Sequence, residues 1–141
     1  MNRKTRRRIL RIASRVPGLY ALLAFGFARR ATVRGWSMTP ALLPDERLIF
    51  DRLAYTRDAP HVGDIALVAH PLRPELRIVK RLAGVPGDIV GGRVLERGEY
   101  WVEGDDPDRS TDSREFGPVR RSDLLGRAWV RYWPAERWRV W

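Results

Sequence analysis

Lysine is rare in this chain, and one lysine lies where its amine could act as a base. The sequence has 27 basic residues, and all are arginines except Lys4 and Lys80. An arginine cannot lose its proton in a protein, whereas a buried lysine amine readily does. If residues 76–83 form a strand, Lys80 shares a face with Ile78 and Leu82, and apolar neighbours lower the pKa of an amine. Lys80 is therefore a candidate general base; the alternative is a lysine that reaches solvent from a strand edge.

A serine that such a base could activate lies at position 37, in Gly35-Trp36-Ser37-Met38-Thr39-Pro40. A serine hydroxyl becomes a nucleophile when a neighbouring base takes its proton. Taken alone, a serine close to a proline more often marks a turn or caps a helix. The nucleophile interpretation gains weight only together with Lys80 and a third feature.

That third feature is a polar loop from Gly104 to Arg114, which holds more carboxylates and hydroxyls than an ordinary surface turn needs. The alternative is a solvated or cation-binding loop, but the acids lack the spacing of an EF-hand. The chain has no cysteine and only two histidines, His61 and His70. We therefore predict neither a metal site nor any other cofactor.

Three segments together resemble the signatures of the type I signal peptidases. They are SMTP at 37–40, VKRLAGVPGD at 79–88 and EGDDPDRSTDSREFGPV at 103–119, in the order of that family. GDIALVAHP at 63–71 is similar to the strand that precedes the family's lysine segment. Each motif alone is weak evidence, but three in order at these spacings are strong.

The resemblance implies a Ser/Lys dyad protease and a role for each matching residue. Ser37 corresponds to the nucleophile and Lys80 to its general base. Ser110 corresponds to the hydroxyl that orients the lysine amine, and Asp112 and Arg114 to an ion pair that holds the loop. The implied reaction is acyl transfer through an acyl-enzyme, which water later hydrolyses.

The same resemblance assigns supporting roles near the nucleophile. Met38 and Pro40 would shape the turn that carries Ser37, and the backbone N–H of Ser37 would meet the oxyanion. Some relatives have a serine two positions before the nucleophile as a second donor, and this chain has Gly35 there. The second oxyanion donor is therefore left unassigned.

The elements that must position these residues are predicted to be short strands. Runs of β-branched and aromatic residues alternate with Gly, Pro and Asp turns, which favours a mostly β, compact antiparallel domain of signal peptidase type. A single helical turn is expected at Ser122–Leu125. The predicted strands cover 47–55, 64–70, 76–83, 99–104 and 127–133.

The net charge of +10 lies entirely in the N-terminal part of the chain. Residues 1–34 carry ten basic and no acidic side chains, and they include an apolar run at 16–28. We predict a basic arm with a short apolar membrane-associating helix at 1–32, and the protease domain at 33–141. At 13 residues the run is short for a span. Three outcomes are therefore compatible with it: a short or tilted span, an interfacial helix, and a hairpin or helix packed on the domain. The N-terminus would be cytoplasmic, with the domain on the outer face if the segment spans and cytoplasmic if it does not.

The predicted function is a serine endopeptidase that removes an N-terminal leader or signal peptide from a precursor protein. A dedicated maturation protease of nickel-type superoxide dismutase is the alternative, because the short chain and the segment GDDPDRSTDSREFGPV also resemble that branch. A non-catalytic membrane-surface module would need only the basic arm. A self-cleaving repressor lacks room for a DNA-binding module before Ser37, and a nucleic-acid partner is not expected because the domain itself is neutral.

Overall fold

The computed structural model describes residues 17–141. Residues 1–16, which include Lys4 and seven of the ten basic residues of 1–34, lie outside the described residues. The helices are α2 (Pro17–Gly26), α3 (Ala54–Arg57) and α4 (Ser113–Phe116), with 3-10 turns η1 (Pro107–Arg109), η2 (Arg121–Asp123) and η3 (Ala135–Arg137). The strands are β1 (Arg29–Thr32), β2 (Arg47–Asp51), β3 (Ile65–His70), β4 (Arg73–Gly84), β5 (Ile89–Val90), β6 (Arg93–Val94), β7 (Glu99–Glu103), β8 (Val119–Arg120), β9 (Leu124–Trp133) and β10 (Arg139–Val140).

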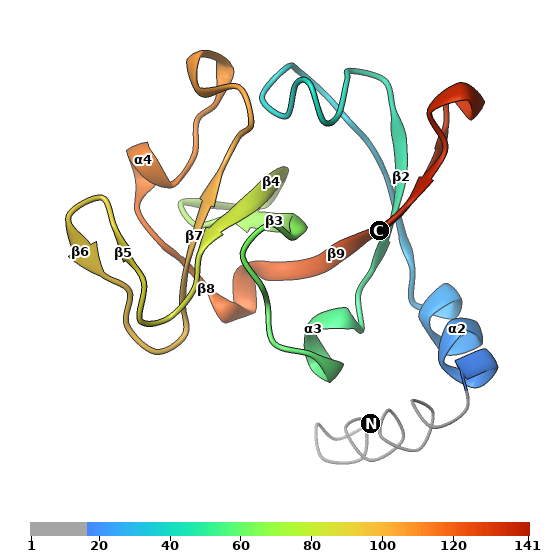
Figure 1. Cartoon of the computed structure of the whole chain (residues 1–141), viewed down its shortest axis with the longest axis horizontal. Coiled ribbons are helices and arrows are strands. Elements are labelled where there is room, and N and C mark those ends of the chain that lie inside the picture. Colours follow the sequence, from blue (N-terminus) through green and yellow to red (C-terminus); the bar gives the residue numbers. More distant parts are fainter. Residues whose placement is uncertain (1–16) are drawn as a thin grey trace.

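One antiparallel sheet organises the described chain, as predicted (Figure 1). Its strand order is β1-β2-β9-β3-β4-β7-β8, with β10 added to β9, and β5 and β6 form a separate hairpin. The long strand β4 lies near the middle of this order and pairs with β3 from Arg73 to Arg81. The sheet therefore brings together segments that lie far apart in the sequence.

Both faces of β3 are buried, which explains its continuous apolar run. Ile65 and Leu67 pack into one hydrophobic cluster, together with Met38 and Phe50. Ala66 and Val68 alternate with them and pack into a second cluster on the other face. Cross-strand pairing carries this burial to β4, where Lys80 lies opposite Ala66.

Four of the five predicted strands correspond to β3, β4, β7 and β9, but the strand predicted at 47–55 was too long. β2 ends at Asp51, whose carboxylate accepts hydrogen bonds from the N–H groups of Leu53 and Ala54. These bonds turn the chain into the short helix α3 instead of continuing the strand. The turn predicted at Ser122–Leu125 is the 3-10 turn η2, which ends at Asp123 because Leu124 already begins β9.

The N-terminal helix α2 contacts the domain. The Tyr20 hydroxyl donates a hydrogen bond of 2.6 Å to Asp51, and Ala24 is fully buried. β1 follows at Arg29–Thr32 and pairs with β2, so the sheet begins before residue 33, where the domain was predicted to start. Within residues 17–141, the structure has no helix with the length and hydropathy needed to cross a membrane.

Candidate active site

The amine of Lys80 is held inside the domain by its place on β4. Only 4% of Lys80 is exposed, and Leu82, on the same face of the strand, is fully buried. Burial lowers the pKa of Lys80; the negative charge of Asp112 opposes that shift and the positive charge of Arg114 adds to it. The neutral amine, which can accept a proton, is therefore favoured more than in an exposed lysine.

A hydrogen-bonded chain connects this amine to a buried carboxylate. Lys80 Nζ donates to Ser110 Oγ at 2.9 Å, and Ser110 Oγ donates to Asp112 Oδ2 at 2.5 Å. Arg114 closes the chain with bonds from Nε and Nη2 to the two carboxylate oxygens of Asp112, at 2.9 and 2.6 Å. We call these four residues the lysine network.

Asp112 is completely buried, and both of its carboxylate oxygens accept hydrogen bonds. Burial by itself would raise its pKa, but hydrogen bonds from Arg114, the Gly104 N–H and Ser110 together hold the pKa of Asp112 well below its usual range. The carboxylate also caps α4 by accepting a bond from the Arg114 N–H. Asp112 therefore stays ionised, so it keeps Ser110 turned as an acceptor toward Lys80.

Gly104 makes this arrangement possible, and sequence reasoning did not single it out. A Cβ at this position would overlap both the Ser110 side chain and the carbonyl oxygen of Ser37. Only glycine allows such a close backbone approach. The feature of the sequence that could have indicated this role is the position of Gly104 at the start of the polar loop.

Ser37 lies in a loop between β1 and β2, next to the polar loop (Figure 1). The Asp106 N–H donates to the Ser37 carbonyl at 3.0 Å, which joins the two loops. Met38 is buried in the first hydrophobic cluster and anchors the loop, while Pro40 stays exposed. Gly35 has a φ of 75°, a conformation that favours glycine, and it has no side-chain hydroxyl to offer.

One cavity of about 360 Å³ joins Ser37 and Lys80. Within residues 17–141, no hydrogen bond links the side chains of Ser37 and Lys80. The Lys80 amine bonds to Ser110 instead. The cavity is bounded by the segment after β1 on one side and by β4 on the other. Its lining consists of Thr32, Val33, Arg34, Ser37, Met38, Leu76, Arg77, Ile78, Val79 and Lys80.

The strand edge beside this cavity is open. β4 pairs with β7 only from Arg81 to Gly84, so on that side the stretch before Arg81 has no partner strand within residues 17–141. Such an edge presents backbone donors and acceptors that an extended peptide can use. The site can therefore take a polypeptide in strand conformation past Ser37.

A second network holds the far end of the Ser37 loop, and sequence reasoning missed it. Buried Glu46 forms ion pairs with Arg131 at 3.1 Å and with Arg137 at 2.6 Å. Arg131 also donates to the carbonyl of Ala41 at 3.0 Å, and Glu46 accepts from the Leu43 N–H. We call Glu46, Arg131 and Arg137 the arginine network. It fastens the loop to β9 and to the C-terminal segment.

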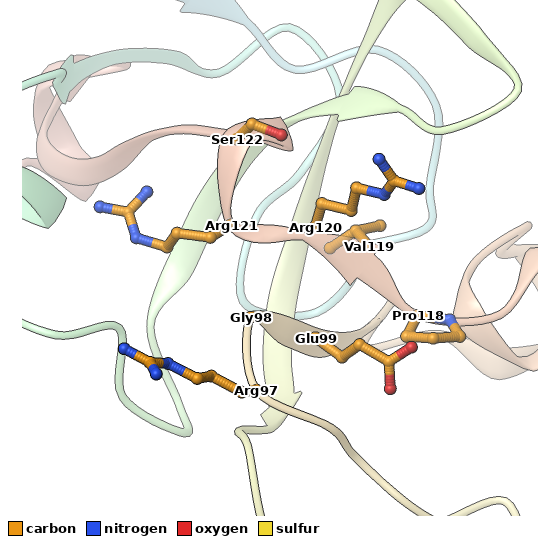
Figure 2. A pocket seen from close by; sticks show the side chains of 8 residues that line it. All are labelled: Arg97, Gly98, Glu99, Pro118, Val119, Arg120, Arg121 and Ser122. Carbon is orange, nitrogen blue, oxygen red and sulfur yellow. The ribbon is translucent and has the colours of Figure 1, made fainter.

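A different hollow of about 530 Å³ lies between the start of β7 and the turn that follows β8, and it shares no residue with the Ser37 cavity. In Figure 2, Arg97 and Arg121 extend to one side of it and Arg120 points away. Arg121 is engaged with the Tyr55 carbonyl oxygen and ring. Among the described residues, no group of three or more His, Asp or Glu side chains is placed to hold a metal ion.

The fold and these contacts define a mostly β domain with a buried lysine and a serine at one cavity. The family model described as signal peptidase, peptidase S26, matches residues 6–93 and 89–133. The chain belongs to this family. It is a serine endopeptidase that cleaves leader peptides, as predicted.

Curated relatives agree with this assignment. Mitochondrial inner membrane protease subunit 1 of Xenopus tropicalis is 35% identical over 84% of this chain and 78% of its own length. Signal peptidase I of Leptolyngbya laminosa is 33% identical over 85% and 78% of the two chains. Mitochondrial inner membrane protease subunit 2 of Mus musculus is 36% identical over 77% and 69%. These names favour the broad function over a dedicated maturation protease of nickel-type superoxide dismutase.

Proposed function

We propose that this endopeptidase works through a Ser/Lys dyad, with Ser37 as nucleophile and Lys80 as general base. The observation that carries the proposal is the buried Lys80 amine, bonded to Ser110 and lining the same cavity as Ser37. A buried amine with a lowered pKa is suited to take a proton from a hydroxyl near neutral pH.

The reaction would proceed in two halves. Neutral Lys80 accepts the Ser37 proton while Ser37 Oγ attacks the scissile carbonyl, and the resulting ammonium then protonates the leaving amine as the peptide bond breaks. Lys80, neutral again, takes a proton from water, whose oxygen attacks the acyl-enzyme ester. The ester bond breaks, Ser37 regains its proton and the new carboxyl terminus leaves.

We assign positioning roles to the residues around the dyad. Ser110 holds the Lys80 amine, and Asp112 with Arg114 holds Ser110. Met38 and Pro40 shape the turn of Ser37, whose own N–H would stabilise the oxyanion. Gly35 offers no side-chain donor. A second oxyanion donor would therefore have to be another backbone N–H or a group that moves into place when substrate binds.

We infer that the substrate is the leader junction of a precursor protein, bound as an extended strand along the open edge of β4. Two features support this mode of binding: the edge of β4 before Arg81 that β7 does not cover, and the apolar residues among those that line the cavity. Backbone bonding to a strand edge tolerates varied side chains, which suits a protease that reads a short junction.

We also propose that the N-terminal arm attaches the enzyme to a membrane with its N-terminus on the cytoplasmic side. Leu22 and Phe25 on α2 are 70% and 62% exposed, and the basic residues of the arm suit anionic lipid headgroups. Leu22→Glu with Phe25→Glu in the full chain should lower flotation with anionic vesicles, whereas Val62→Glu, at another exposed apolar site, should not. Equal flotation of both variants would contradict the attachment.

The dyad is tested with a precursor whose leader ends in small residues, incubated with the full chain in detergent or in vesicles. Wild-type protein should release the mature product at one site, read by mass spectrometry of the new N-terminus. Ser37→Ala should lose this cleavage and keep its thermal unfolding curve, while Ser122→Ala, an exposed serine, should cleave normally. Cleavage at the same site by Ser37→Ala would overturn the proposal.

A further inference from the structure

The charged residues that line the Ser37 cavity all carry positive charge when protonated. Besides Lys80 they are Arg34, in the segment after β1, and Arg77, on β4. No aspartate or glutamate is among the lining residues. A peptide that enters this cavity therefore meets two permanent positive charges, since arginine stays protonated.

Neither arginine is neutralised by the part of the chain that the structure describes. The salt bridges of residues 17–141 involve Arg57, Arg81, Arg93, Arg109, Arg114, Arg131 and Arg137, and Arg34 and Arg77 take part in none. Both side chains are exposed, in contrast to the buried Lys80. Their guanidinium donors therefore have no carboxylate partner within residues 17–141 and can pair with one that a ligand brings.

The positions of the two arginines are related to those of the dyad. Arg34 precedes Ser37 by three residues, and Arg77 precedes Lys80 by three. At about 3.3 Å per residue, three positions along β4 cover roughly 10 Å. This spacing applies to Arg77 alone, because Arg34 lies in the loop after β1. Arg77 and Lys80 are an odd number of residues apart on β4, so their side chains point to opposite faces of the strand. A substrate strand along β4 would pass Arg77 about three residues from the position beside Lys80, with Arg34 on the other wall of the cavity.

We propose that Arg34 and Arg77 make this protease select leader junctions that carry an aspartate or glutamate within a few residues of the cleaved bond. The inference rests on the proposed dyad function and adds a substrate class to it. Guanidinium and carboxylate match each other in geometry and charge. Exposed ion pairs are weak individually, but two arginines at one partly enclosed cavity should give a preference of about tenfold.

The test uses internally quenched peptides that span a junction with small residues before the cleaved bond. Aspartate or asparagine is placed in turn at each of the four positions on either side, and kcat/KM is measured for the full chain. Wild-type protein should prefer aspartate over asparagine about tenfold at one position, less so in 1 M salt. Arg34→Gln and Arg77→Gln should each reduce that ratio, and the double variant should bring it close to one. Arg73→Gln, an exposed arginine on the same strand outside this cavity, should keep the ratio.

The outcomes separate this inference from the function it rests on. Efficient cleavage of the asparagine peptides with an aspartate ratio near one, or with the same ratio in the double variant, would overturn the acidic preference and leave the dyad standing. A complete lack of cleavage of both peptide sets would overturn both. If the double variant lost binding to anionic vesicles and kept the ratio, the arginines would be a lipid contact instead.

Discussion

The lysine network and the arginine network both centre on a buried carboxylate close to the loop of Ser37, but only the lysine network contains an amine that can act as a base. In the lysine network, the carboxylate of Asp112 faces a guanidinium on one side and the Ser110 hydroxyl on the other. That hydroxyl bonds to a buried amine whose pKa is lowered. The network therefore connects fixed charge to a titratable base.

In the arginine network, Glu46 binds two guanidinium groups, and these bind backbone carbonyl oxygens. Arginine keeps its proton at any physiological pH, so neither guanidinium can serve as a base, and both hold the loop in place. Both networks thus hold a buried carboxylate paired with arginine, and these features alone do not supply an amine that can act as a base. The lysine in place of an arginine makes the difference.

The largest expected effect comes from removing that difference. Lys80→Arg should lower kcat/KM by on the order of 10³-fold, because a guanidinium cannot accept the Ser37 proton. The matched change Arg131→Lys in the arginine network should keep activity within about tenfold of wild type, because Arg131 exchanges no proton. Both are measured with one quenched peptide at fixed pH, alongside thermal unfolding. Comparable losses in the two variants would remove the functional distinction between the networks.

A substitution in the arginine network should instead lower the stability of the protein. Glu46→Ala leaves Arg131 and Arg137 without their carboxylate, and breaking a buried ion pair from one side costs about 3–5 kcal/mol of unfolding free energy. Urea unfolding at pH 7 measures this loss, with Glu136→Ala, an exposed glutamate in η3, as the control. The folded fraction of the variant should keep the wild-type pH–rate profile. A profile displaced along the pH axis would mean that Glu46 acts on the base.

A smaller effect is expected from Ser110→Ala, which breaks the lysine network at its middle. The amine loses its acceptor and its orientation, so kcat/KM should fall about 10- to 100-fold. A hydrogen bond to Ser110 favours the charged amine, so its loss should lower the pKa of Lys80 and move the acid limb of the pH–rate profile to lower pH. Ser122→Ala serves as the control. An unmoved acid limb would argue that Ser110 is only structural.

The last prediction concerns the pH dependence of the wild-type enzyme itself, without any substitution. Because the neutral amine is the active form, kcat/KM should rise with pH, about tenfold per unit, until the pKa of Lys80 is passed. Burial places that pKa below the ordinary lysine value of 10.5. The profile of kcat/KM against pH should therefore level off before pH 10.5. A rate that still climbs at that pH would exclude Lys80 as the titrating base.

Sequence reasoning found the members of the lysine network in two ways: Lys80 is chemically unusual in this chain, and the resemblance to signal peptidases assigned roles to Ser110, Asp112 and Arg114. Lys80 is the single lysine after residue 34, and the polar loop is dense in acids and hydroxyls. The arginine network escaped notice, since Glu46 lies 85 residues from Arg131 and arginine is the commonest charged residue in the chain. Nothing in the spacing of those residues marks them as partners.

By itself, the sequence determined the family, the antiparallel β class and the residue types that can do chemistry, because motif order and strand-length apolar runs are local properties. Only the tertiary structure decided that β2 stops at Asp51 and that Gly104 leaves room for Ser110 and the Ser37 carbonyl. It also decided that Arg34 and Arg77 line the same cavity as Ser37 and Lys80. These facts depend on sheet pairing and burial between distant segments. Such contacts are set by packing in three dimensions and leave little trace in local spacing.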